Sequence, residues 1–367
     1  MRQYNYCILG AGLAGILLGY RLAKSHKKVI IIDPNGIASG ASSTPLALAS
    51  PATGRFAKKG LKSDEALESI SNMLDTNIDK LTSFITNKKL IRPCFDEEIA
   101  EKTKKNIWHD NWINGAIEWL DKEEIQYRFP LLNQSYGGVI VHNSYVIDPS
   151  GYLKLILKEI EKHDGSIIEH SDFHFDYHQE ENTWYFEIDS RSFRANELIH
   201  CTGDTTLTQI EQRGTKIKGQ TLSLSLLKNH PMYSAWTSFL KKFSISAQGY
   251  LCTLDNDNWV LGSTYEHRFT TINPDEKGQN YLIDKLSRIS IDLPELVTIN
   301  EQWAGIRYST PDRKPIIGTL NHEKREHIFR GLASKGILYA HLYSESMRDY
   351  LINGRTLPKE VTIDRYL

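Results

Sequence analysis

The sequence predicts an α/β fold that opens with a Rossmann-like unit, in which two parallel strands are joined by a crossover helix. The β-prone run Tyr4–Leu9 leads directly into the motif GAGLAG, and the apolar run Val29–Ile32 ends in Asp33. An unbroken run of β-branched residues is typical of a strand buried on both faces of a parallel sheet. The segment Leu13–Ser25 between these runs has the apolar positions of a helix. Strand, glycine turn, helix and strand therefore follow one another in the required order.

The motif GAGLAG places Gly10, Gly12 and Gly15 at the spacing of a nucleotide-binding turn. Gly10 permits the tight turn, Gly12 lets a pyrophosphate approach the backbone, and Gly15 allows close packing of the helix on the strand. The helix N-terminus then faces the phosphates, and Leu13 and Ala14 of its first turn belong to the same predicted site. Asp33 is placed to accept hydrogen bonds from ribose hydroxyls, which disfavours a 2′-phosphate and hence NADP. These residues predict a dinucleotide site and leave NAD and FAD open.

Composition excludes several classes of protein. The 367 residues are 40% hydrophobic and 24% charged with a formal net charge of −1, so no global charge favours nucleic acid or an anionic membrane. The four cysteines are widely spread and form no CxxC motif, which argues against a disulfide framework or a zinc site. No stretch approaches the roughly 20 apolar residues of a membrane span, and the N-terminal apolar run is too short for a signal peptide. We expect a cytoplasmic protein with no metal and no membrane association.

The segment IASGASSTPLALASPATGR, Ile37–Arg55, is rich in small and hydroxyl side chains. An NAD-binding fold normally continues here with a helix and a third strand, whereas this stretch predicts an extended loop and a helix N-terminus that could line a polar or anionic surface. A flexible surface loop is the alternative, but Leu46 and Leu48 interrupt the polarity and indicate packing. The candidate binding residues of this loop are Ser39, Gly40, Ala41, Ser42 and Ser43.

Taken together, GAGLAG, Asp33 and the SGASS loop resemble the FAD-dependent D-amino acid oxidase and glycine oxidase superfamily. The resemblance continues in order over nearly the full length, in VIDPSGYLKLILKEIEKHDG, ELIHCTGDTT, KGQT, VLGSTYE, WAGIRYSTPDRKPIIG and GLASKGILYAH. Within the superfamily, SGASS and GLASKG are most similar to the oxidoreductase part of the bifunctional enzyme that matures wobble-uridine modifications in tRNA. The methyltransferase part of that enzyme has no counterpart in this sequence.

The resemblance implies FAD as the cofactor and two interleaved domains. The FAD-binding domain is expected from residues 1–88, 146–218 and 303–367, and a smaller, antiparallel-sheet substrate domain from residues 89–145 and 219–302. Monomeric sarcosine oxidases of the superfamily attach flavin through a cysteine at about the position of Gly305. Glycine at this position implies noncovalent FAD.

The resemblance also assigns roles to individual residues. Thr202 and Gly203 lie where the superfamily has a turn near the adenine dinucleotide, and the loop before the last helix is expected to contact the flavin through Gly331, Ser334, Lys335, Gly336 and Ile337. Arg307 is expected beside the flavin, where its planar fork would grip a substrate carboxylate; pairing with Asp312 across a turn is the alternative. Tyr250 resembles a tyrosine that helps hold the same carboxylate, or it is a half-buried aromatic residue of a sheet. Lys335 could add positive charge near flavin or substrate, or be a solvated lysine.

The leading functional hypothesis is a noncovalent FAD oxidoreductase that oxidises the CH–NH bond of a small amino acid or of a carboxylate-bearing secondary amine, with oxygen or another acceptor. A second hypothesis is oxidation of a carboxymethylaminomethyl group on tRNA, for which Arg313, Lys314, Lys324, Arg325, Arg330 and Lys335 would supply basic charge. A third is a 2-hydroxy acid or glycerol-phosphate dehydrogenase, and a fourth is a non-enzymatic flavoprotein scaffold.

The sequence makes five local predictions. GYLCTLDNDNWVLGSTY predicts a hairpin, with Asp255–Asn258 as its turn. Trp303–Gly318 predicts a second hairpin with a charged tip. Asp148-Pro149-Ser150 is expected to start a helix, with an acid or a serine as its N-cap. The last helix is expected to run from about Ile337 to Ile352 and to end at Asn353-Gly354. The periodicity of apolar residues over Asn106–Leu120 indicates an amphipathic helix.

Overall fold

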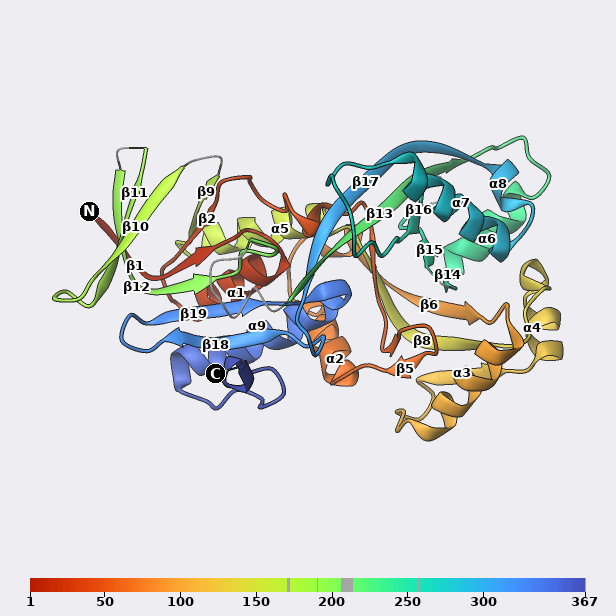
Figure 1. The fold of residues 1–367 in the computed structure, drawn as a ribbon, viewed down its shortest axis with the longest axis horizontal. Coiled ribbons are helices and arrows are strands. Elements are labelled where there is room, and N and C mark those ends of the chain that lie inside the picture. Colours follow the sequence, from red (N-terminus) through yellow and green to blue (C-terminus); the bar gives the residue numbers. More distant parts are fainter. Residues whose placement is uncertain (170–171, 190, 206–213, 248, 256–257, 367) are drawn as a thin grey trace. The chain divides into compact units, whose positions relative to one another are not determined.

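The computed structural model describes residues 1–169, 172–189, 191–205, 214–247, 249–255 and 258–366. The chain forms two compact units. The first unit comprises Met1–Ser43, Pro149–Ile217 and Ile306–Leu367, and the second comprises Thr44–Asp148 and Lys218–Gly305. Each unit contains a sheet of its own (Figure 1). Within the described ranges, no helix is both long and apolar enough to cross a membrane.

The first unit is built on a mainly parallel sheet. Its parallel strands lie side by side in the order β19 (Glu326–Arg330), β12 (Arg191–His200), β1 (Arg2–Leu9), β2 (Val29–Asp33), β9 (Ser166–Glu169). The antiparallel strands β18 (Ile316–Asn321), β10 (Phe173–His178) and β11 (Thr183–Ile188) extend it. The helices are α1 (Leu13–Lys24), α5 (Pro149–Lys162) and α9 (Gly336–Asn353), with short 3-10 turns at Ala41–Ser43, Ala333–Lys335 and Ile363–Tyr366. The predicted order of strand, turn, helix and strand is confirmed by β1, α1 and β2.

The second unit is built on a longer sheet with helices at its margins. The strand order is β17 (Val297–Ser309), β13 (Thr215–Leu226), β16 (Asn258–Gly262), β15 (Tyr250–Cys252), β14 (Phe243–Ser246), β6 (Ile85–Pro93), β8 (Gly138–Ile147), β3 (Ala47–Ala49), and β7 (Ile117–Leu120) pairs with β8. Strands β4 (Ala52–Thr53) and β5 (Lys58–Lys59) form a separate hairpin. The helices are α2 (Ser63–Leu74), α3 (Glu97–His109), α4 (Lys122–Arg128), α6 (Tyr233–Lys242), α7 (Glu276–Ile289) and α8 (Leu293–Leu296), and 3-10 turns lie at Leu81–Ser83 and Pro130–Leu132.

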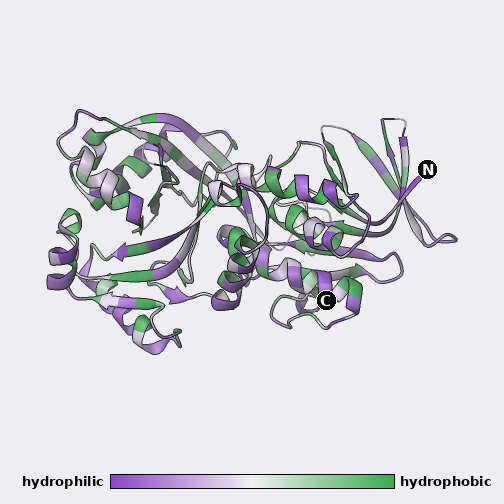
Figure 2. Ribbon diagram, turned by 180° about the vertical axis from the view of Figure 1, so that it is seen from behind, coloured by the Kyte–Doolittle hydropathy of each residue, from purple (hydrophilic) through white to green (hydrophobic). Residues whose placement is uncertain are grey.

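Apolar residues follow the inner strands of both units (Figure 2). In the first unit, Val29–Ile32 of β2 is buried throughout, as its uninterrupted apolar run predicts, and β1 is buried at Tyr4 and over residues 6–9. In the second unit, α6 and α7 cover one face of the sheet with Trp236, Leu282 and Leu286, which pack with Trp259 of β16. All four cysteines are buried and free.

The structure divides the chain differently from the sequence prediction at the first boundary. Residues 44–88 were assigned to the first domain, but they cluster with the second unit. The reason is strand pairing, because β3 and β6 both pair with β8 in the second sheet. This segment makes the second unit the longer of the two. Its sheet is also not purely antiparallel, since β14 runs parallel to β6.

Two local predictions are wrong. Trp303–Gly318 is not a hairpin, because β17 pairs with β13 whereas β18 pairs with β19 in the other sheet. Asn106–Leu120 is not one helix: α3 stops at His109, Asp110 adopts an extended conformation, and the chain resumes as β7 after Gly115, whose φ is +76°. The apolar residues that suggested one helix belong to two elements: Ile107 lies in α3, whereas Ile117 and Leu120 lie in β7.

The other local predictions are confirmed. Strands β15 and β16 form the expected antiparallel hairpin, although the predicted turn residues Asn256 and Asp257 lie outside the described residues. Helix α5 begins at Pro149. Helix α9 ends at Gly354, whose φ of +64° is the left-handed conformation that glycine adopts at a helix C-terminus.

An ion pair between a buried lysine and a partly exposed aspartate joins α7 to the sheet of the second unit and provides a test of acid stability. Lys218, 1% exposed, contacts Asp275 at 2.5 Å, and Asp275 caps α7 by accepting from the Gly278 N–H. The hydrogen bond from Lys218, with that from Gly278, lowers the pKa of Asp275 to about 2. Because the folded pKa is depressed below about 3.9, the stabilisation is present above about pH 4 and is lost as the pH falls through about 2.

We therefore expect Asp275→Asn, which keeps a capping side chain, to lower the thermal midpoint by a few degrees at pH 6. The difference from the parent protein should shrink between pH 4 and pH 3, measured by circular dichroism. Asp284→Asn is the matched control, because Asp284 forms only an exposed ion pair with Arg288 on the same helix. A difference that is constant across this pH range would contradict the assignment.

Candidate functional site

The candidate site of the first unit lies at the edge of its sheet where four parallel strands end. Strand β1 leads into the turn Gly10–Gly15, β2 ends at Asp33, β12 leads into Cys201–Gly203, and β19 leads into Gly331–Gly336. Ligands of open α/β sheets bind beyond the carboxyl ends of the strands. The predicted segments far apart in the sequence therefore meet at one edge (Figure 1).

The glycine turn is sterically closed to larger residues. Gly10 has a φ of +107°, and a Cβ there would lie 2.4 Å from the carbonyl oxygen of Cys201. A Cβ on Gly15 would lie 1.9 Å from the carbonyl oxygen of Gly10. Both distances are far below any non-bonded contact, so this turn requires glycine at both positions.

The N-terminus of α1 is open to an anion. Its N-cap is Gly12, which has no side chain to cap it, and its first turn carries no acidic residue. By contrast, α3 and α7 are capped by Asp96 and Asp275. The Ser42 hydroxyl accepts from the N–H of Leu13 at 3.1 Å, which brings the SGASS loop to the same helix end. The backbone N–H groups and the positive end of this helix fit a pyrophosphate.

Asp33 lies against this turn and is half-buried. Its carboxylate accepts from the N–H groups of Ala11 at 2.8 Å and Asn35 at 2.9 Å. These bonds fix the carboxylate and leave acceptor positions for ribose hydroxyls. The loop that follows is held by Glu169, which sequence reasoning missed and which accepts from the Ile37 N–H at 2.6 Å. Ser39 and Gly40 are exposed, and the Ser43 hydroxyl donates to the Gly40 carbonyl.

The turn after β12 is held by a buried arginine. Arg330, 2% exposed, donates to the carbonyls of Gly203 and Thr205, each at 2.7 Å, and its guanidinium lies 4.4 Å from the ring centroid of Tyr308. The tRNA hypothesis named Arg330 as one of the basic residues that would contact phosphates. Because Arg330 is buried, it cannot have that role. Its place at the end of the buried strand β19 was the available signal.

The loop before α9 approaches the N-terminus of α1. Gly331 has a φ of +77°, and a Cβ on Gly336 would lie 3.3 Å from the Leu13 side chain. Since Gly336 and Leu13 are the first residues of α9 and α1, two helix N-termini meet there, and α9 too has neither a side-chain cap nor an acid in its first turn. Lys335 is half-buried, and burial together with repulsion from Arg313 lowers its pKa. Ser334 is exposed and Ile337 is buried.

The two predicted substrate residues lie in different units. Arg307 is half-buried on β17 in the first unit. Asp312 receives hydrogen bonds from Arg365 at 2.9 Å and Tyr366 at 2.8 Å, and although burial opposes it, these bonds lower the pKa of Asp312 to about 2. Asp312 is therefore engaged by the C-terminal segment. In the second unit, the Tyr250 hydroxyl donates to the Leu46 carbonyl at 3.0 Å, so in this conformation its proton is not directed at a ligand.

The model of a family described as FAD dependent oxidoreductase matches residues 5–349. The bifunctional protein of tRNA 5-methylaminomethyl-2-thiouridine biosynthesis from Leptospira interrogans is 25% identical over 98% of this chain, which spans 59% of that relative's length. Glycine oxidase of Bacillus subtilis is 21% identical, covering 99% of this chain and 95% of the relative.

Solved structures share the fold. Glycine oxidase from Geobacillus kaustophilus superposes with a TM-score of 0.82 at 18% identity, covering 97% of this chain and 96% of the other. L-alpha-glycerophosphate oxidase from Mycoplasma pneumoniae with FAD bound gives a TM-score of 0.76 at 17% identity, with coverage of 98% and 97%. At these identities the superpositions establish the fold alone.

Proposed function

This chain belongs to the FAD-dependent oxidoreductase family, and within that family we propose that it oxidises the CH–NH bond of a small amino acid or of a secondary amine that carries a carboxylate. The observation that carries the proposal is the half-buried Arg307 on β17, next to a turn whose acid, Asp312, is engaged by Arg365. Similarity to glycine oxidase over 99% of the chain supports the same substrate class.

The residues of the first unit fit FAD. The turn Gly10–Gly15 and the N-terminus of α1 would hold the pyrophosphate, Asp33 would accept from a ribose hydroxyl, and the segments Thr202–Gly203 and Gly331–Ile337 would line the remainder. Bound FAD supplies a hydride acceptor for oxidation of the substrate. Gly305 offers no side chain for a covalent link, so we propose that FAD is held noncovalently.

Arg307 would bind and orient the substrate. Its guanidinium presents parallel donors that match the two oxygens of a carboxylate, which fixes the carbon bearing the amine. Positive charge at the N-terminus of α9, with Lys335 beside it, would stabilise negative charge that develops in the site. Tyr250 lies in the second unit, where its hydroxyl donates to the Leu46 carbonyl, and its role toward the carboxylate stays a prediction. A neutral amine can release hydride without a catalytic base, so no further proton acceptor is required.

A second candidate function is oxidation of a carboxymethylaminomethyl group on tRNA. It is favoured by the similarity to the bifunctional tRNA-biosynthesis protein over 98% of this chain. Arg313 is exposed and its charge acts on Lys335, whereas the exposed Lys324 and Arg325 lie in the β18–β19 turn, at the opposite edge of the sheet from the glycine turn. The bond and the carboxylate are the same as in the leading proposal, so Arg307 would have the same task.

A panel of reductants under anaerobic conditions separates the candidates. We expect small amino acids or secondary amines with a carboxylate to bleach the flavin absorbance within minutes, because Arg307 orients their CH–NH bond. 2-Hydroxy acids and glycerol phosphate should leave it unchanged. A tRNA bearing carboxymethylaminomethyl-uridine belongs in the panel, and bleaching by this tRNA alone would select the second candidate.

The control for the panel is the same set of compounds mixed with free FAD. Bleaching of the protein by hydroxy acids or glycerol phosphate, and not by amines, would overturn the proposal. A purified protein that is colourless and takes up no added FAD would overturn the binding site as well.

A further inference from the structure

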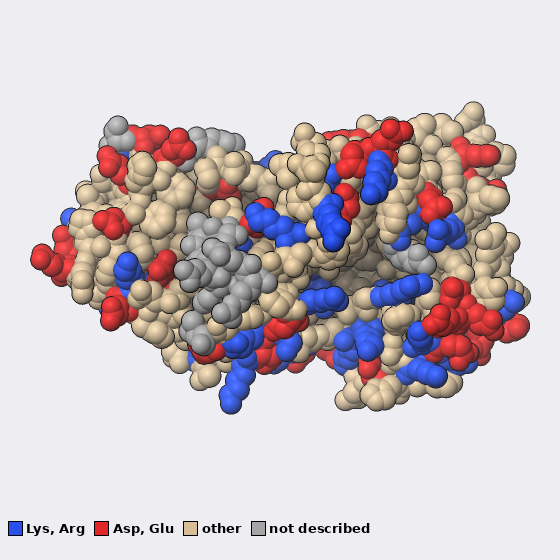
Figure 3. Space-filling view, viewed as in Figure 1, with Lys and Arg blue, Asp and Glu red and all other residues tan. Residues whose placement is uncertain are grey.

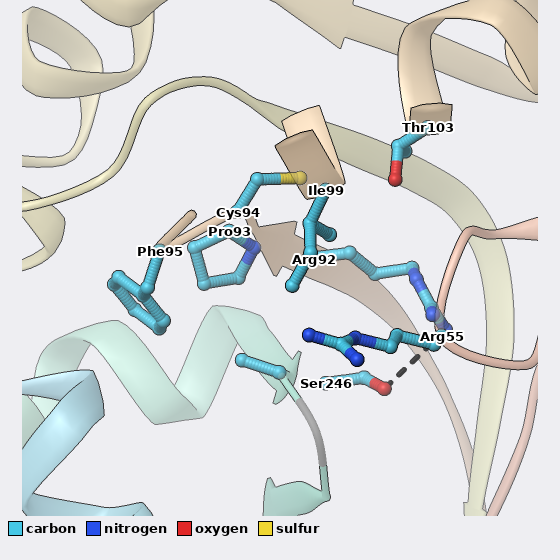
Figure 4. A pocket seen from close by; sticks show the side chains of 9 residues that line it. Arg55, Arg92, Pro93, Cys94, Phe95, Ile99, Thr103 and Ser246 are labelled. Carbon is cyan, nitrogen blue, oxygen red and sulfur yellow. Dashed lines mark hydrogen bonds between the residues drawn. The ribbon is translucent and has the colours of Figure 1, made fainter. Parts of the chain in front are cut away.

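A pocket in the second unit contains two arginines. It is lined by Arg55, Arg92, Pro93, Cys94, Phe95, Ile99, Thr103, Ser246 and Ala247 (Figure 4). No acidic side chain is among these lining residues, and the other members are apolar or carry a neutral hydroxyl or thiol. A space-filling view shows lysine and arginine side chains gathered around a hollow in this unit (Figure 3). The pocket therefore has a positive character that the protein's net charge of −1 does not reveal.

Arg92 forms the inner part of the pocket. Its guanidinium donates to the carbonyls of Ala52 at 2.9 Å and Gly54 at 2.5 Å, and to the Ser246 hydroxyl at 3.3 Å. Among the described residues no carboxylate forms an ion pair with it, so neutral oxygens alone receive its charge. Burial lowers the pKa of Arg92 to about 10. Arginine stays protonated at neutral pH even so, and its positive charge remains without an opposite charge.

Arg55 forms the outer part. It lies in the loop between β4 and β5, which Arg92 holds through the Gly54 carbonyl and Asn106 holds through the Phe56 carbonyl at 2.7 Å. The Arg55 side chain is exposed and extends across the pocket between Arg92 and Ser246 (Figure 4). The exposed Arg55 is thus positioned by the half-buried Arg92.

We propose that Arg55 and Arg92 form an oxyanion subsite that binds a carboxylate or phosphate group of a ligand. Both guanidinium groups line this pocket, and an oxyanion there would accept charge-assisted hydrogen bonds from Arg55 and lie in the positive field of Arg92. Pro93, Phe95 and Ile99 exclude water from one side and strengthen the interaction. The subsite lies in the second unit and does not depend on the flavin or on the proposed function of the first unit. A second anionic group on a small substrate and a phosphate of RNA share this chemistry.

Arginine-selective modification tests the subsite without catalysis. The FAD-loaded protein is treated with phenylglyoxal, and the rate at each arginine is measured by peptide mass spectrometry with and without inorganic phosphate. We expect phosphate at about 20 mM to slow modification of Arg55 by about fivefold. Arg288 is the internal control, since it is exposed and ion-paired with Asp284 on α7, and its rate should not change. Equal rates at Arg55 with and without phosphate would overturn the proposal.

Variants separate binding from folding. Arg55→Gln should weaken phosphate binding by about tenfold in a calorimetric titration, while its circular dichroism spectrum stays that of the parent. Arg92→Lys keeps the charge and tests whether the loop still presents Arg55. Binding that is unchanged in Arg55→Gln would overturn the subsite. Because no turnover is measured, failure here is distinct from failure of the flavin panel.

Two further ligands distinguish the source of the oxyanion. Succinate and a short single-stranded RNA are compared as protectors of Arg55 in the same modification assay. Stronger protection by succinate identifies a small anionic substrate. If RNA protects Arg55 more strongly, calculated per phosphate, and this protection is lost as the salt concentration rises, the ligand is a nucleic-acid backbone.

Discussion

Replacing Arg307 with lysine is expected to lower kcat/KM for carboxylate-bearing amines by about a hundredfold while leaving the FAD content unchanged. Lysine keeps the positive charge but offers a single point donor in place of the planar fork, so the carboxylate loses one of two parallel hydrogen bonds and its orientation. Arg307 lies on β17, outside the glycine turn and the loop before α9 that we propose hold FAD. The measurements are steady-state kinetics and the absorbance ratio of flavin to protein.

Arg313→Lys is the matched control, because Arg313 is an exposed arginine in the turn that follows β17. Its kinetics should equal those of the parent protein. A second comparison uses an amine substrate without its carboxylate, whose already low rate should be insensitive to Arg307→Lys. If that compound and the carboxylate substrate lost rate equally, Arg307 would act on the flavin environment and not on the carboxylate.

The Rossmann-like unit could be predicted from signals between neighbouring residues of the chain. The positions of β1, α1 and β2 follow from a glycine spacing, an apolar run and a terminal acid, all within 33 residues of the N-terminus. Each of these signals arises from neighbours in the chain, so no knowledge of distant contacts was required. The same holds for the end of α9 at Gly354 and for the β15–β16 hairpin.

Features that depend on residues far away in the chain could not be predicted from the sequence. The turn at Thr310–Pro315 looks like a hairpin, but whether β17 and β18 pair depends on β13 and β19, which lie elsewhere in the chain. Arg330 lies at the end of a buried strand, but the carbonyls of Gly203 and Thr205 to which it donates lie 127 and 125 residues earlier in the chain. The pair Arg55 and Arg92 is likewise brought together by the β4–β5 hairpin lying against β6.

Replacing Gly15 with alanine is expected to abolish FAD binding and to destabilise the first unit by about 3 kcal/mol. A methyl group at this position would lie 1.9 Å from the carbonyl oxygen of Gly10, so either α1 or the turn after β1 must move. Both form the proposed pyrophosphate site, and a shift of either misdirects the N–H groups at the helix N-terminus. The measurements are the flavin content of the purified protein and its chemical denaturation.

Gly19→Ala on the same helix separates this steric effect from the general effect of alanine. Alanine favours a helix by about 1 kcal/mol over glycine, and at Gly19 the added methyl group meets the tip of the Ile31 side chain at 2.8 Å, which can rotate away. At Gly15 the obstacle is backbone, which cannot move without opening the turn. Gly19→Ala should therefore keep its flavin and Gly15→Ala should lose it. Equal flavin content in the two variants would mean that close contact between α1 and the turn is not what forms the site.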